Sequence, residues 1–173
     1  MNLIITCARH LEPETKEELR GILEEYGDSD AKISITNMSG ILTAETKLEP
    51  VEIVRKMREM LLDEPWSIRY CLRIIPIQIF VETKMEEIEK TIIEESKHIM
   101  EDETYRISIE KRNSDISSQE IITRVANKIK NKVSLEFPDK IILIEILGNK
   151  TGISILKKSD VLSVEKTKRS ISE

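Results

Sequence analysis

The stretch from Thr104 to Lys158 constrains the fold more than any other part of the sequence. From Tyr105 to Glu110, apolar and polar residues alternate, which is typical of a β-strand with one buried and one wet face. A helical pattern follows, and then a long apolar strand at 141–147 and a closing strand at 151–156. The stretch therefore predicts a strand, a helix and two further strands in that order.

The helix in this stretch has a defined start. Ser117 and Glu120 form an S-x-x-E capping box, in which each side chain bonds the backbone N–H of the other residue. The helix is predicted to run to about Lys130 with one apolar face, while Arg124 and Lys128 share its polar side.

Four segments of the stretch occur in a recognisable order. They are Glu110-Lys-Arg-Asn, the helix start Ser117-Ser-Gln-Glu-Ile-Ile, Val133-Ser-Leu-Glu-Phe-Pro-Asp, and Ile144-Glu-Ile followed by Gly152-Ile-Ser. In this order they resemble a THUMP domain, an RNA-binding module of tRNA- and rRNA-modifying systems. The upstream segment Arg69-Tyr-Cys-Leu-Arg-Ile-Ile-Pro is similar to the one that leads into the domain in this family. The resemblance implies that the chain docks on the acceptor region of tRNA.

The first 75 residues predict a β-α-β-β-α-β order. The predicted strands are 3–8, 31–36, 41–46 and 67–75, and the predicted helices run from Pro13 to Gly27 and from Pro50 to Pro65. The turn Asn37-Met-Ser-Gly separates two alternating strands, which indicates a hairpin. This order is that of a ferredoxin-like domain.

A strand at 77–81 and a helix from 85 to about 100 are predicted to open the second domain, with Thr83 and Glu86 as a further capping box. We therefore expect an α+β protein. Its ferredoxin-like domain covers residues 1–75, its THUMP domain covers 76–165, and residues 166–173 are predicted as a disordered tail.

The net charge of −5 is unevenly distributed. Residues 1–64 hold 8 Lys and Arg against 14 Asp and Glu, whereas residues 106–132 hold 7 against 3. A basic face confined to the second half is what a phosphate-binding surface requires. Ordinary balancing of surface charges is the alternative interpretation.

Two cations, Lys111 and Arg112, lie where the predicted strand ends beside the predicted helix start. We expect them to hold one phosphate between them, together with exposed backbone N–H groups. For Arg124, an ion pair with Glu120 is the alternative. Because no aromatic residue is expected on the solvent-exposed faces, binding through tRNA shape and backbone is favoured over base stacking. The candidate RNA-binding residues are Arg73, Lys111, Arg112, Asn113, Ser117, Arg124, Lys128, Lys132 and Lys150.

Sequence patterns for catalysis are mostly absent. There is no G-x-G-x-x-G or other glycine-rich phosphate loop. Cys7 and His10 have metal-like spacing, but a zinc site needs four ligands, and Cys7 is better explained as a buried strand thiol. The sequence predicts no enzymatic activity, no cofactor and no metal site.

The chain resembles the stand-alone THUMP adaptor of a tRNA cytidine acetyltransferase, and this resemblance implies a tRNA-binding protein that presents tRNA to a separate modifying enzyme. One alternative is a non-catalytic subunit for tRNA thiolation or methylation. Another is an interaction protein with no RNA role, which is favoured if the basic face is internally paired. We expect the acidic residues 1–75 to position the THUMP domain or dock a protein partner. With two cysteines, no signal peptide and no membrane-length apolar run, a cytoplasmic location is predicted.

Overall fold

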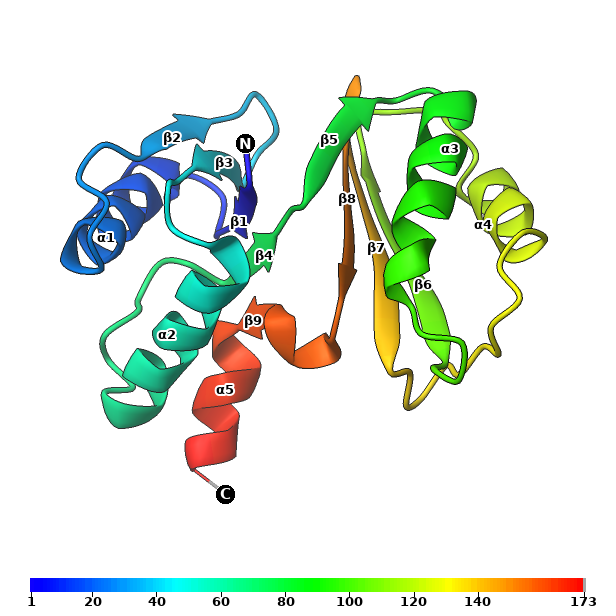
Figure 1. Cartoon of the computed structure of the whole chain (residues 1–173). Coiled ribbons are helices and arrows are strands. Elements are labelled where there is room, and N and C mark those ends of the chain that lie inside the picture. The colour runs from blue at the N-terminus through cyan, green and yellow to red at the C-terminus, as the bar shows by residue number, and fades with distance from the viewer. Residues whose placement is uncertain (173) are drawn as a thin grey trace. The chain divides into compact units, whose positions relative to one another are not determined.

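The computed structural model describes residues 1–172, which form two compact units (Figure 1). Unit 1 contains residues 1–77 and 160–172, and unit 2 contains residues 78–159. The chain therefore leaves unit 1, forms all of unit 2, and returns to unit 1 at its C-terminal end.

Unit 1 is built on a five-stranded sheet. Its elements are β1 (Leu3–Thr6), α1 (Glu12–Glu25), β2 (Lys32–Ile35), β3 (Ile41–Glu45), α2 (Pro50–Asp63), β4 (Arg73–Pro76), β9 (Leu162–Ser163) and α5 (Val164–Ile171). The strand order is β2-β3-β1-β4-β9, and every neighbouring pair is antiparallel. The β-α-β-β-α-β order over the first six elements confirms the ferredoxin-like prediction.

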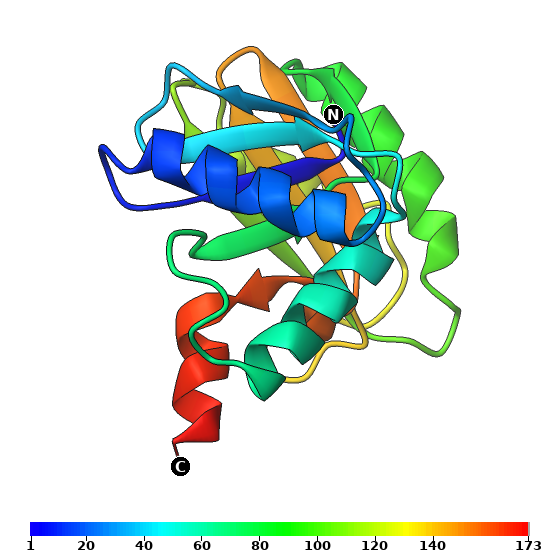
Figure 2. The ribbon, with the colours of Figure 1, turned by 90° about the vertical axis from the view of Figure 1, so that its left-hand side faces the viewer.

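One face of this sheet packs against α1 and α2 (Figure 2). Alternate residues of β1, such as Leu3 and Ile5, join Leu19 of α1 and Met57 of α2 in a single buried cluster. The turn before β3 needs glycine at Gly40, because its φ is +76° and a Cβ there would lie 2.6 Å from the carbonyl oxygen of Cys7.

The strand predicted over 67–75 is shorter in the structure, where β4 covers only Arg73–Pro76. The backbone of the preceding loop is bonded to a side chain from α1. The Glu18 carboxylate accepts the N–H groups of Arg69, Tyr70 and Cys71 at 2.8, 3.0 and 2.9 Å. Because these donors are satisfied by a carboxylate, the loop has no need of a neighbouring strand.

Residues 166–172 of the predicted disordered tail form most of helix α5 and its C-cap, and residues 160–165, predicted within the THUMP domain, belong to unit 1. Residues 160–172 return to unit 1, where β9 extends the sheet beside β4 and α5 packs near α2. Leu162 and Val164 are buried in the core of unit 1, and Arg58 of α2 donates to the carbonyl oxygen of Val161 at 2.9 Å. Glu173 lies outside the described residues.

Unit 2 is a four-stranded sheet with two helices on one face. Its elements are β5 (Ile79–Glu82), α3 (Met85–Glu95), the 3-10 turn Ser96–His98, β6 (Tyr105–Arg112), α4 (Ser118–Ala126), β7 (Lys140–Leu147) and β8 (Lys150–Leu156). The strand order is β5-β8-β7-β6. Only β6 and β7 are parallel, because α4 provides the crossover between them, whereas β7 and β8 form an antiparallel hairpin.

The core of unit 2 lies between the sheet and these helices. Ile142, Ile144 and Ile146 of β7 point to this side, together with Tyr105 of β6 and Ile121 of α4. The intervening residues of β7 point to the opposite face and are buried as well, and they include one charged residue, Glu145.

Two details of unit 2 correct the sequence predictions. The hydroxyl of Thr83 does not cap α3; it is hydrogen bonded to the hydroxyl of Thr151 at 2.8 Å, and Lys84 is the residue before the helix. Helix α4 ends at Ala126, four residues earlier than predicted. Across residues 1–172, no helix is both long and apolar enough to cross a membrane.

Candidate nucleic-acid interface

One end of unit 2, where both α3 and α4 begin, carries three lysines, of which Lys150 lies on the side of the sheet without helices. Lys111 lies near the end of β6, Lys150 begins β8, and Lys84 precedes α3. The Gly148 N–H donates to the carbonyl oxygen of Arg112 at 2.8 Å. In the same β7–β8 turn, the carbonyl oxygen of Asn149 accepts the N–H of Thr83, the residue after β5, at 3.0 Å. We call this the helix-start end of unit 2 (Figure 1).

Lys111 lies directly beside the start of α4. Its Nζ donates to the carbonyl oxygen of Ile116 at 2.9 Å, and Ile116 immediately precedes the N-cap residue Ser117. Asn113 turns the chain out of β6 with a φ of 54°, a left-handed conformation that asparagine tolerates better than most residues. Because Lys111 is exposed and its hydrogen-bond partner is a neutral carbonyl, its charge is not cancelled.

The start of α4 adds to this positive potential. The Ser117 Oγ accepts the N–H of Glu120 at 3.1 Å, so the serine half of the predicted capping box is present. The Glu120 carboxylate instead accepts from Arg124 at 3.1 Å. The other first-turn N–H groups and a partial charge of about +0.5 at a helix N-terminus attract anions such as phosphate.

Arg112 points away from Lys111. Successive strand residues face opposite sides of a sheet, and Arg112 lies on the side without helices. There its Nη1 donates to Oε2 of Glu145 at 2.9 Å, and the Glu145 side chain is only 1% exposed. The predicted shared phosphate site is therefore corrected: this geometry offers Lys111, and not the pair, to one phosphate at the start of α4.

Arg124 and Lys128 are both bound by Glu89 of α3. The Glu89 carboxylate lies 2.7 Å from Lys128 and 3.1 Å from Arg124, with 14% of its side chain exposed. The hydrogen bonds from Lys128 and then Arg124 lower the pKa of Glu89, and the bond to Glu89 raises the pKa of Arg124. These two cations link α3 to α4, and part of their charge is neutralised.

Lys84 and Lys150 have one carboxylate nearby, Glu82, which competes only weakly with a phosphate for these lysines. In the register of β5 and β8, Glu82 is opposite Lys150, and the Glu82 carboxylate also lies 2.9 Å from Lys84. Lys84 first and Lys150 second lower the pKa of Glu82. The side chains of Glu82 and Lys84 are 59% and 66% exposed, so their ion pair contributes little energy and can exchange for a phosphate contact.

The remaining predicted residues lie elsewhere. Lys132 is at the opposite end of unit 2, where its carbonyl oxygen accepts the N–H of Tyr105 at 3.0 Å. The six residue steps of β6 from Tyr105 to Lys111 separate the two ends by about 20 Å. Arg73 belongs to unit 1, in β4, between Thr6 and Ser163 of the neighbouring strands.

Sequence reasoning missed Lys84, whose position just before a predicted helix was the available signal. It also expected no aromatic residue on a wet surface, whereas Phe137 of unit 2 is 84% exposed and Trp66 of unit 1 is 70% exposed. Both lie in loops, where strand and helix periodicity gives no information on exposure.

Within residues 1–172, no three His, Cys, Asp or Glu side chains are grouped so that they could hold a metal ion. Cys7 and Cys71 are free thiols, and both are buried, as expected for Cys7.

Comparison with known proteins finds similarity in the second half of the chain. Residues 82–156 match the model of the THUMP domain family. An uncharacterised protein of Methanocaldococcus jannaschii, MJ0421, is 31% identical over 106 residues, which cover 58% of this chain and 29% of the relative. The chain therefore spans less than a third of the curated relative that it matches.

Three solved structures share the fold. PH1313 from Pyrococcus horikoshii has a TM-score of 0.65 at 19% identity, with 91% of this chain and 55% of that chain covered. A 4-thiouridine synthetase solved with RNA and ATP has a TM-score of 0.56 at 15% identity, covering 91% and 42%. TrmN from Thermus thermophilus has a TM-score of 0.56 at 12% identity, covering 90% and 45%. The chain thus matches the THUMP domain model over residues 82–156, and a ferredoxin-like fold precedes this match.

Proposed function

We propose that this protein binds tRNA through its THUMP domain and presents the tRNA to a separate modifying enzyme. The match over residues 82–156 carries the proposal, because it includes the whole helix-start end, with Lys84, Lys111 and Lys150. The similar fold of a 4-thiouridine synthetase solved with RNA supports the same class of ligand.

The cations are not equivalent in this proposal. Lys111 contacts a phosphate at the start of α4, and Lys84 and Lys150 contact neighbouring phosphates of the same RNA. Arg112, Arg124 and Lys128 contribute less, because each would have to give up a carboxylate partner that is at most 14% exposed. These three residues are therefore internally paired, which is the condition that favours an interaction protein without an RNA role. Lys111 is not paired with a carboxylate in this way.

A salt titration of tRNA binding tests the role of Lys111. The logarithm of the association constant falls with the logarithm of salt concentration, by roughly one unit of slope for each phosphate neutralised. Lys111→Ala should weaken binding to all tRNAs alike and reduce the slope by about one. The matched control is Lys97→Ala, which removes the same charge from an exposed lysine after α3.

The outcome is read from the two variants together. Loss of affinity and slope in Lys111→Ala alone supports the proposed interface. Equal effects of the two variants would mean that the RNA responds only to net charge. An unchanged slope in Lys111→Ala, with the far-ultraviolet circular dichroism spectrum intact, would remove this residue from the interface.

The modifying partner is a further part of the proposal. We favour a cytidine acetyltransferase, on the resemblance to the stand-alone adaptor type. A thiolating or methylating enzyme is the second candidate, because the similar folds include a 4-thiouridine synthetase and TrmN. Unmodified tRNA incubated with the protein and acetyl-CoA, S-adenosylmethionine or ATP should yield no modified nucleoside by mass spectrometry. A product lost on mutation of one polar residue would make this chain the enzyme.

A further inference from the structure

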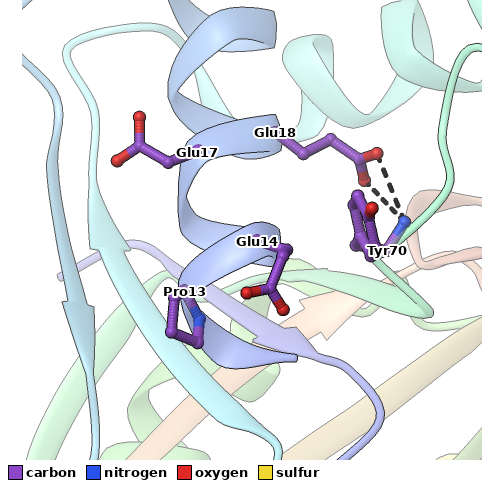
Figure 3. A pocket seen from close by; sticks show the side chains of 5 residues that line it. All are labelled: Pro13, Glu14, Glu17, Glu18 and Tyr70. Atoms are coloured by element: carbon purple, nitrogen blue, oxygen red, sulfur yellow. Dashed lines mark hydrogen bonds between the residues drawn. The ribbon is translucent and has the colours of Figure 1, made fainter. Parts of the chain in front are cut away.

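A hollow on unit 1 lies between α1 and the loop that leads into β4 (Figure 3). It has a volume of about 580 Å³ and is lined by Pro13, Glu14, Glu17, Glu18 and Tyr70. Helix α1 supplies four of these residues, and Tyr70 forms the facing wall from the loop. The hollow belongs entirely to the acidic part of the chain and is separate from the candidate RNA interface.

The loop wall is held in place before any partner binds. Glu18 accepts three backbone N–H groups of the loop, and Figure 3 shows its bonds to Tyr70. A second anchor comes from α5, where Lys168 donates to the carbonyl oxygen of Ile68 at 2.9 Å. Because the loop is already fixed at both points, it loses little conformational entropy when a partner binds, and this favours affinity.

Aromatic side chains on this loop resemble those of protein-binding surfaces. Tyr70 lines the hollow, and Trp66, four residues earlier on the same loop, is 70% exposed. Tryptophan, tyrosine and arginine are the residues most enriched among those that dominate protein–protein binding energies. The ring of Tyr70 already has a guanidinium beside it, since the Arg69 Cζ lies 5.6 Å from the ring centroid.

The charge of the hollow selects the kind of partner. Figure 3 shows the carboxylates of Glu14 and Glu18 on the side of Tyr70, whereas Glu17 points away from it. Among the described residues, Glu17 pairs with Arg20 at 3.5 Å, while Glu14 makes no ion pair. A phosphate backbone would be repelled here, and residues 1–64 as a whole carry 14 Asp and Glu against 8 Lys and Arg.

We propose that this hollow is a docking site for a protein partner, which inserts an arginine side chain between Glu14 and Tyr70. A planar guanidinium stacks on an aromatic ring and bonds a carboxylate with two parallel N–H groups, which lysine cannot do. An apolar residue next to that arginine packs on Trp66. This interaction is independent of tRNA binding by unit 2.

The test uses the full chain labelled with nitrogen-15 and two synthetic peptides. One peptide carries a single arginine flanked by leucines, and the other replaces the arginine with citrulline, which has nearly the same shape and no charge. We expect the arginine peptide to give saturable shifts of the Glu14, Glu18 and Tyr70 amide signals and to change Trp66 fluorescence. The citrulline peptide should bind at least about tenfold more weakly.

A pair of variants locates the contact. Glu14→Gln should weaken the arginine peptide about tenfold, while Glu24→Gln, an exposed acid of the same helix outside the hollow, should leave its affinity unchanged. Equal binding of the two peptides, or no binding of either, overturns the proposal. The proposal also fails if tRNA shifts the same signals, or if they move on dilution of the protein alone, because the hollow would then hold RNA or a second copy of the chain.

Discussion

Replacing Arg112 tests whether this cation serves the fold or the RNA. Its guanidinium is bonded to Glu145 at 2.9 Å, with 24% of the arginine and 1% of the glutamate side chain exposed. Removing one partner of a buried ion pair costs about 3 to 5 kcal/mol, because a charge remains buried with less compensation. Since Arg112 is partly solvated, we expect Arg112→Met, which preserves most of the packing, to destabilise unit 2 by about 3 kcal/mol.

The assay is urea denaturation, supported by hydrogen exchange of the β7 amides to locate the loss in unit 2. About 3 kcal/mol corresponds to a fall in melting temperature of roughly 6 to 12 °C for a chain of this size. In a Glu145→Gln background the same arginine substitution should cost only about 1 kcal/mol, because no carboxylate charge is left buried.

The opposite pattern would refute this reasoning. If Arg112→Met leaves the free energy of unfolding within about 0.5 kcal/mol of the wild type and weakens tRNA binding as much as Lys111→Ala, then Arg112 contacts RNA. Its bond to Glu145 would then contribute little to the fold.

Three further predictions concern other parts of the structure. Leu162→Ala should destabilise unit 1 by about 3 kcal/mol in thermal unfolding, because Leu162 is fully buried. Ile171→Ala, at a 40% exposed position, should have a small effect, and equal effects of the two substitutions would argue against β9 as part of the core. Ser117→Ala should cost about 1 kcal/mol through loss of the α4 cap, and Ser118→Ala, measured in parallel, should cost clearly less. The hydrogen bond from Thr46, followed by those from the Lys47 and Asp30 backbone, lowers the pKa of Asp28. The stabilisation by this carboxylate is therefore present above the unfolded pKa of about 3.9 and is lost as the pH falls through the lower folded pKa. The stability difference between wild type and Asp28→Asn should shrink at acid pH, and a larger difference there would contradict this assignment.

Local sequence patterns predicted most of the two sheets. Alternation in 105–110 marked β6, and the mostly apolar run of 141–147 marked β7, which is buried on both faces. The capping serine at Ser117 was readable as well, because the side chain and the N–H that it accepts are three residues apart. Each of these features is decided by neighbours in the sequence.

The features that were missed depend on residues far apart in the chain. The loop before β4 is held by Glu18, about fifty positions earlier, so its apolar residues were mistaken for a longer strand. Residues 160–165 were assigned to the THUMP domain because nothing local shows that Leu162 and Val164 become buried in unit 1, where β9 pairs with β4 and contacts α2. Similarly, nothing local shows that Glu89 of α3 binds the cations of α4.

The charge distribution connects the two proposals. With a net charge of −5, the chain as a whole repels RNA, so tRNA affinity has to come from a few cations whose charge is not cancelled nearby. Lys84, Lys111 and Lys150 meet this condition better than the cations bound to Glu89 or Glu145, so we expect a salt slope near that of three phosphate contacts, about −3. Unit 1 has the opposite advantage, since its carboxylates disfavour RNA at the hollow beside Tyr70 and favour a basic protein segment. A division of this kind would allow one chain to hold an RNA and a protein without competition between the two ligands for the same surface.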